Sequence, residues 1–142
     1  MRGVIFGLTP THSKGHIFRS LLEGTAYFFR WTRETFEQTT NMRIDKAFAV
    51  NGGAKSSLWR QILSDVTGIT QQYIADSPGA PLGDAIIGAV ACGTLHNFNE
   101  GIKWINISEK TTPNRGNQAN YDHYYMSFKQ LCVDLDKRIT SA

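Results

Sequence analysis

Two glycines between a predicted strand and a predicted helix are the residues of this 142-residue chain best suited to contact a ligand. Gly52 and Gly53 follow the apolar run 47–50, which is typical of a buried strand, and precede apolar residues at helical spacing over 58–66. Because glycine has no side chain, a nucleotide base or phosphate can approach the main chain there. The next helix start adds unpaired amide hydrogens and a positive dipole end. The stretch indicates a nucleotide site, although such a turn also occurs as a plain connection.

A histidine pair near the start of the chain offers a second kind of chemistry. His12 and His16 lie four residues apart, which on a helix would place both rings on one face, as a metal site requires. Neither a glutamate nor a third ligand accompanies them in a zinc-enzyme pattern, and Gly15 lies between them. We therefore expect polar residues of a helix start, and no metal site.

A helix rich in small residues is predicted over 82–95, after a turn at 76–81. Such a helix can lie close to a sheet or a ligand because few side chains hold it away. Pro81 suits the first helical position, where its missing amide hydrogen costs nothing. Asp84 suits the first turn through the helix dipole, and contact with a ligand hydroxyl is the alternative role.

The remaining elements alternate between strands and helices, which predicts an α/β domain. We expect strands at 3–9, 47–50 and 70–75, an edge strand within 102–107, and helices from Thr11 or Ser13 to about Thr39, from a cap at Ser56 or Ser57 to Gly68, over 82–95 and over 118–139. The first strand pattern opens abruptly, which leads us to expect further sequence upstream.

Composition excludes several classes of function. The formal charge is +3 and the pI about 9.0, but basic and acidic residues are interleaved, so we expect no nucleic-acid partner. No apolar run is long enough to cross a bilayer, and we expect no membrane partner and a cytoplasmic protein. Cys92 and Cys132 lie far apart in apolar helical patterns, which predicts two buried, reduced thiols.

Three ordered stretches together resemble the carboxy-terminal domain of the FGGY family of carbohydrate kinases. The first joins residues 3–9 to 16–24, the second is 51–68, and the third is 79–85. The second is similar to the adenosine-binding segment of that family, and the third to its later glycine-alanine helix start. The resemblance covers essentially the whole chain and favours the pentulose kinases, including the xylulose kinases.

The resemblance implies an actin-like, Hsp70-like and hexokinase-like ATPase fold with a ribonuclease H-like motif, of which residues 1–142 form the later part of the second domain. It implies ATP and Mg²⁺ as cofactors and a sugar or polyol, a ketopentose above all, as phosphoryl acceptor. In the family the catalytic base is an aspartate of the amino-terminal domain, which also makes most sugar contacts. We therefore assign no catalytic residue here and expect the chain alone to be inactive.

Carried over residue by residue, the resemblance implies two groups of nucleotide contacts. The adenine and α-phosphate side comprises Gly52, Gly53 and Ala54, with Lys55, Ser56 and Ser57 near them, and the opposite side comprises Gly79, Ala80 and Gly83. Arg19 and Glu23, one helical turn apart, are expected to be structural.

Two other interpretations of the sequence are considered. One is a catalytically silent, actin-like interaction domain that pairs with another chain, and a homo-oligomer remains open. The other, a dinucleotide-binding Rossmann enzyme, is disfavoured because Gly52 and Gly53 do not supply the Gly-x-Gly-x-x-Gly spacing.

Overall fold

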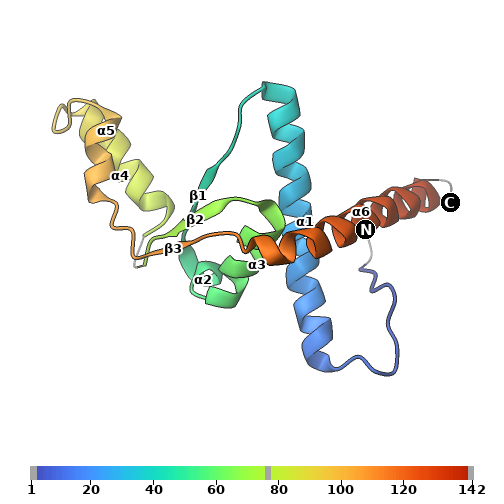
Figure 1. Cartoon of the computed structure of the whole chain (residues 1–142). Coiled ribbons are helices and arrows are strands. Elements are labelled where there is room, and N and C mark those ends of the chain that lie inside the picture. Colours follow the sequence, from blue (N-terminus) through green and yellow to red (C-terminus); the bar gives the residue numbers. More distant parts are fainter. Residues whose placement is uncertain (1–2, 76–77, 141–142) are drawn as a thin grey trace.

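The computed structural model describes residues 3–75 and 78–140, apart from the side chains of 137–140. In chain order, its elements are α1 (Lys14–Thr40), β1 (Lys46–Ala49), α2 (Asn51–Ala54), α3 (Ser57–Thr67), β2 (Thr70–Tyr73), α4 (Ala80–Ala91), α5 (Phe98–Gly101), the 3-10 helix η1 (Ile102–Trp104), β3 (Glu109–Thr111) and α6 (Arg115–Thr140). Figure 1 shows this mixture of long helices and a small sheet.

The sheet has three strands in the order β1-β2-β3. β1 and β2 are parallel, with Lys46 opposite Thr70 and Ala49 opposite Tyr73, and α3 provides the crossover between them. β3 runs antiparallel to β2. Because β1 and β2 are parallel neighbours, the segments that follow them leave from the same edge of the sheet.

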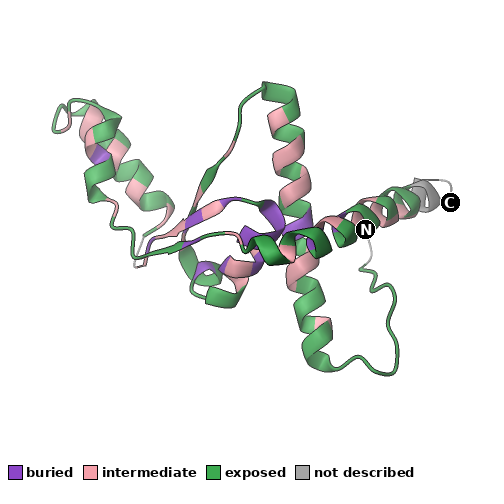
Figure 2. Cartoon of the chain, in the orientation of Figure 1, coloured by how far each residue is buried: buried purple, intermediate pink, exposed green. Residues whose placement is uncertain are grey.

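The hydrophobic core lies where α1, α3 and α6 meet. Its buried members are Ala26 and Tyr27 of α1, Ile62 and Val66 of α3, and Tyr121 and Tyr125 of α6. Figure 2 shows buried residues gathered at this junction, while both ends of α1 are largely exposed. α3 also contacts β2 and β3, so it connects the helical core to the sheet.

The ends of α1 and α3 follow from local hydrogen bonds. Ser13 precedes α1, and its amide donates to Nδ1 of His16 at 3.0 Å. Of the two predicted caps for α3, Ser56 is the one observed, because its hydroxyl accepts from the amide of Trp59 at 3.2 Å. Gly68 ends α3 with a left-handed φ of 70°, as expected.

The start of α6 is held by α3. Oδ1 of Asp65, which is buried, accepts from the amide of Asn114 at 2.7 Å, and Oδ2 accepts from Nδ2 of Asn117 at 2.9 Å. A carboxylate that accepts amide hydrogens at a helix start stabilises that helix. These hydrogen bonds fix the start of α6 to α3, which also contributes Ile62 and Val66 to the core.

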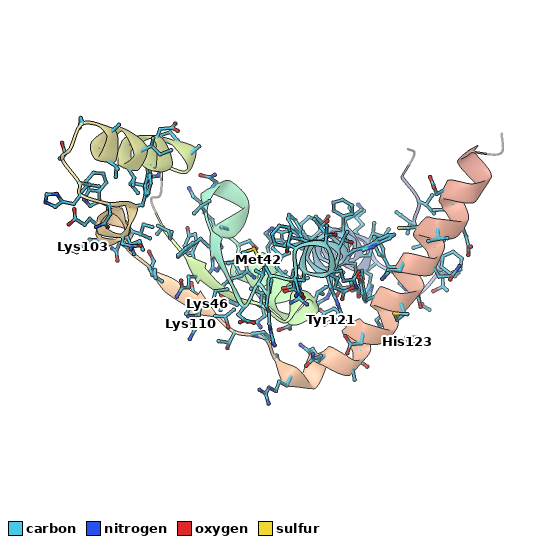
Figure 3. The ribbon with its side chains drawn as sticks, turned by 90° about the horizontal axis from the view of Figure 1, so that it is seen from above. Met42, Lys46, Lys103, Lys110, Tyr121 and His123 are labelled. Atoms are coloured by element: carbon cyan, nitrogen blue, oxygen red, sulfur yellow. The ribbon has the colours of Figure 1, made fainter. Side chains whose placement is uncertain are left out.

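The segment from α4 to η1 stands apart from the core. In Figure 3 it lies on one side of α1, marked by Lys103, while α6 lies on the other, marked by His123. Gly101 of α5 is buried against Ile86 of α4, where an added Cβ would lie 2.6 Å from Cγ2 of Ile86. The two short helices therefore pack mainly on each other.

Two of the predicted strands are wrong. Residues 3–9 form no strand, and Phe6 is 81% exposed, since no described strand pairs with them. The edge strand is displaced from 102–107 to β3, and η1 occupies the apolar run instead. Pairing with β2 begins only at Ser108, whose amide donates to the carbonyl of Tyr73 at 2.8 Å.

Other boundaries shift by a few residues. β2 ends at Tyr73 and α4 spans Ala80–Ala91 rather than 82–95, while α6 starts at Arg115. Asp76 and Ser77 of the predicted turn lie outside the described residues. In the part of the chain that is described, no helix has the length and hydropathy needed to cross a membrane.

Candidate functional site

The two glycine-containing segments predicted to contact a nucleotide meet at one edge of the sheet. Asn51, which follows β1, has a left-handed φ of 68°, and Gly79, which follows β2, has a φ of 71°. A Cβ built on Gly79 would lie 2.9 Å from Oδ1 of Asn51. The contact brings together segments that are 28 positions apart in the sequence, as the parallel pairing of β1 and β2 requires.

Gly52 and Gly53 lie in α2 rather than in an open turn, and both are exposed. A Cβ on Gly52 would have no described atom within 4 Å, and one on Gly53 would make ordinary contact with Nε1 of Trp59 at 3.5 Å. Neither residue has a positive φ. The fold therefore requires glycine at neither position, and the contact of both residues with a nucleotide stays a prediction.

The residues after Gly53 have different environments. Ala54 is buried, and its carbonyl accepts from the guanidinium of Arg60. Ser56 is occupied as the cap of α3, whereas Lys55 and Ser57 are exposed beside it. The contact of these four residues with a nucleotide stays a prediction. A nucleotide could touch only the small exposed part of Ala54, which is 8% exposed.

The second predicted group of nucleotide contacts lies at the start of α4. Gly79 is the residue before the helix, and Ala80 and Gly83 are exposed in its first turn. Pro81 occupies the second helical position rather than the first, which still removes an amide that has no partner within the helix. The predicted dipole role of Asp84 is wrong, because Asp84 is the fifth residue of α4 and the first turn contains no acid.

The histidine pair is engaged in local contacts. The rings of His12 and His16 meet edge to face, with centroids 5.7 Å apart. Nδ1 of His12 lies 2.8 Å from the hydroxyl of Thr9, and Nδ1 of His16 lies 3.0 Å from the hydroxyl of Ser13. Across the described residues, no group of three metal-binding side chains comes together.

The cysteine prediction is wrong for Cys92, which is exposed at the end of α4 because that helix packs mainly on α5. The hydroxyl of Thr94, 3.1 Å from its Sγ, lowers the pKa of the Cys92 thiol. Cys132 is half-buried on α6, and burial raises the pKa of its thiol.

Arg19 and Glu23 contact the core rather than the candidate site. Nε of Arg19 lies 2.8 Å from Oε1 of Glu23, and a second guanidinium nitrogen donates to the hydroxyl of Tyr121 at 3.0 Å. That hydroxyl lies 3.2 Å from Oε1 of Glu23. The triangle joins α1 to α6, as a structural role predicts.

The part that Arg60 plays beside the site was not identified from the sequence. It is 2% exposed and contacts the end of α2. An available signal was its position between Trp59 and Ile62, on the helix face that carries apolar residues. A charged residue on such a face requires buried partners.

An α/β domain with parallel strands and a ligand site at their carboxyl edge is a common architecture of nucleotide-binding proteins. This chain belongs to the FGGY family of carbohydrate kinases, since residues 1–92 match the model of that family's C-terminal domain. The family's members are transferases that phosphorylate alcohol groups, and its fold is the actin/hexokinase-like ATPase fold.

Individual relatives agree with this assignment. The chain is 34% identical over 146 residues to a ribulokinase of Bacillus licheniformis and 27% identical over 133 residues to a xylulose kinase of Lactococcus lactis. These alignments cover 97% and 92% of this chain and 26% of each relative. The crystal structure of a xylulose kinase from Rhodospirillum rubrum superposes with a TM-score of 0.80 at 29% identity, over 92% of this chain and 27% of that one. The chain thus spans about a quarter of the length of these relatives.

Proposed function

We propose that this chain forms the adenosine side of the ATP site in a kinase that transfers the γ-phosphoryl group to a hydroxyl of a sugar or polyol. The observation that carries the proposal is the meeting of Asn51 and Gly79, which places the exposed main chain of α2 opposite the start of α4. A flat base can lie between two such backbone segments because neither Gly52 nor Gly83 projects a side chain.

ATP fits these residues, since a Cβ on Gly52 or Gly83 would enter space that no described atom fills. Bound ATP supplies the γ-phosphoryl group, and Mg²⁺ neutralises charge on the phosphates. We assign Mg²⁺ to the nucleotide phosphates, because Mg²⁺ in such sites is held largely by phosphate oxygens and water. The chain's own contribution is to bind and orient the nucleoside.

We assign the catalytic base and the sugar contacts to polypeptide outside these 142 residues, so the chain alone is expected to be inactive. A ketopentose is the proposed acceptor. The ribulokinase and the xylulose kinases among the relatives support that class. A gluconokinase of Bacillus subtilis, 28% identical over 140 residues, is a relative with a different named substrate.

The test is titration calorimetry of the chain with ADP and Mg²⁺, with GDP as the comparison nucleotide and a ketopentose phosphorylation assay on the same sample. We expect ADP binding that exceeds GDP binding, and no turnover. Gly52→Val should abolish binding while the fold persists, because its side chain would enter open space on the protein. Gly88→Val is the matched control on α4, at another exposed glycine with no described atom nearby.

The second candidate function is a catalytically silent interaction domain whose partner is another copy of the chain. Within the described residues β1 pairs on one side only, and its Phe48 is 56% exposed. Phe48, Phe29 and Phe36 line an apolar groove of about 600 Å³ between α1 and β1. An open strand edge beside apolar surface favours association.

The two functions predict different results for the same protein. ADP binding that Gly52→Val abolishes supports the kinase assignment. Absence of ADP binding, together with a dimer in light scattering that Phe48→Glu dissociates, would replace it with the interaction domain. Turnover by the chain alone would show that the catalytic base had been wrongly placed outside it.

A further inference from the structure

The guanidinium of Arg60 joins the end of α2 to strands β2 and β3. One terminal nitrogen donates to the carbonyl of Ala54, the last residue of α2, and the other donates to the carboxylate of Glu109, the first residue of β3. The guanidinium carbon lies 4.4 Å from the ring centroid of Tyr73, the last residue of β2. One planar group thus contacts both chain segments that lead to the candidate nucleotide site.

We propose that Arg60 is a positioning residue for the nucleotide: it holds the α2 glycines at a fixed place relative to the end of β2. The proposal rests on the proposed function, because the site it positions is the adenosine site described above. Arg60 does not itself contact the nucleotide in this assignment, since its side chain is 3% exposed behind Ala54.

α2 needs an external support of this kind. It has four residues, and the bonds that close it, from the amides of Lys55 and Ser56 to the carbonyls of Gly52 and Gly53, are 3.2 and 3.3 Å long. A single turn that contains two glycines is unstable in isolation, because nucleation fixes several torsions for one hydrogen bond. The contact from Arg60 to Ala54 ties the carbonyl end of this turn to α3.

Arg60 is itself fixed on the sheet side. Its carbonyl accepts from Nε2 of Gln71 at 2.6 Å, and the same amide nitrogen lies 3.1 Å from the hydroxyl of Ser64. Gln71 and Ser64 are both buried, so the backbone that carries Arg60 is anchored to β2. The contact of the guanidinium with Ala54 therefore fixes where α2 lies relative to β2.

The energetics favour a positioning role over a purely stabilising one. Nε of Arg60 is buried and has no hydrogen-bond partner among the described atoms. A buried cation that is incompletely paired stabilises less than an apolar side chain of similar size would. Its planar fork instead reaches a carbonyl and a carboxylate at once, which an apolar residue cannot do.

The test compares Arg60→Gln with Arg43→Gln, an exposed arginine paired with Asp45, as matched control. ADP affinity is measured by calorimetry, and amide hydrogen exchange is followed at residues 53–56, in α3 and in α6. For Arg60→Gln we expect ADP affinity to fall about tenfold and exchange at 53–56 to accelerate, with rates in α6 unchanged. Glu109→Gln keeps the bond to Ala54 and should lower ADP affinity by about threefold or less.

Unchanged exchange at 53–56 in Arg60→Gln, or faster exchange spread evenly over α3 and α6, would overturn the proposal, since a merely structural role predicts the second pattern. If Arg60→Gln does not fold, Arg60→Lys carries the same readouts, because lysine keeps the charge but cannot reach both acceptors. If the parent chain binds no ADP, the proposed function fails, and local exchange at 53–56 still decides whether Arg60 positions α2.

Discussion

The side-chain amide of Asn51 lies against the backbone of Gly79, so that a Cβ on Gly79 would be 2.9 Å from Oδ1 and 3.1 Å from Nδ2 of Asn51. Both residues have positive φ angles, 68° and 71°. Asparagine and glycine are the residues that adopt this conformation most readily. The contact fixes the distance between the start of α2 and the start of α4.

The first prediction concerns this contact. Gly79→Ala should lower the free energy of unfolding by about 1–3 kcal/mol or displace the start of α4, because the new methyl group is strained by φ and crowded by Asn51. Asn51→Gly, which keeps the left-handed backbone, should recover part of this cost when combined with it. Urea unfolding of the four proteins in a double-mutant cycle measures the coupling. Additive costs would show that the two residues do not interact.

The second prediction concerns the support of α6. Asp65→Ala should lower the free energy of unfolding by about 2–3 kcal/mol, since the amides of Asn114 and Asn117 lose their acceptor. Asp134→Ala is the control, because Asp134 is exposed and, among the side chains that the structure describes, accepts from Gln130 one turn earlier. Equal midpoints in urea for the two variants would contradict this role of Asp65.

The third prediction is a pH dependence centred on Glu34. Burial acts to raise the pKa of Glu34, but hydrogen bonds from Tyr125 at 2.5 Å and Arg30 at 3.0 Å outweigh it and leave the pKa below its ordinary value. The unfolded chain therefore binds the proton more readily. The stability from this group is complete above the ordinary glutamate pKa and is lost as the pH falls from about 5 to about 3.

Thermal unfolding across that range checks the effect. Glu34→Gln should flatten the acid dependence relative to the parent, while Glu100→Gln, on α5 outside the core cluster, should retain it. A parent-like slope in Glu34→Gln would mean that another carboxylate is responsible.

The fourth prediction separates the two thiols. Cys92 is exposed with a lowered pKa and Cys132 is half-buried with a raised pKa, so Cys92 should react with iodoacetamide several times faster at neutral pH. Mass spectrometry after timed alkylation identifies the modified peptide. Thr94→Val should slow the reaction of Cys92 by removing the hydroxyl that lowers its pKa, and preferential labelling of Cys132 would contradict the assignment.

The fifth prediction concerns Arg19, whose partners Glu23 and Tyr121 join α1 to α6. Arg19→Ala should lower the free energy of unfolding by about 0.5–1 kcal/mol, a modest value because the side chain is half exposed. ADP affinity should not change. A loss of affinity without a loss of stability would place Arg19 in the site instead.

Much of the fold followed from local patterns. The order α1, β1, α3, β2, α4, β3 and α6 agrees with the predicted order, as do the stop at Gly68 and one of the two predicted caps, Ser56, because apolar spacing and capping chemistry act within a few residues. The short helices α2, α5 and η1 were not predicted. The strand at 3–9 and the position of β3 failed for a common reason. A strand exists only where it has a partner, and sequence alone does not show which backbone edge is available.

The candidate site was anticipated in part. Gly52 and Gly53 are indicated by the pattern of strand, glycine turn and helix, and Gly79 by the family resemblance, and the structure brings their segments together. Arg60 and Asn51 did not, since their roles depend on the carbonyl of Ala54 and the backbone of Gly79, which are distant contacts that no local spacing encodes. The prediction for Cys92 is wrong because an apolar helix need not be buried, and α4 has no buried residue.

The separation of α4 and α5 from the core has a consequence for how this site can change over evolutionary time. The core cluster takes no residue from the described part of the chain between 78 and 104. The α2 half of the site is tied through Arg60 to buried groups, so substitutions there affect stability and binding together. At exposed positions such as Ala80 and Gly83, selection can alter the proposed nucleotide contacts without a matching loss of stability, which makes α4 the half of the candidate site with greater freedom to diverge.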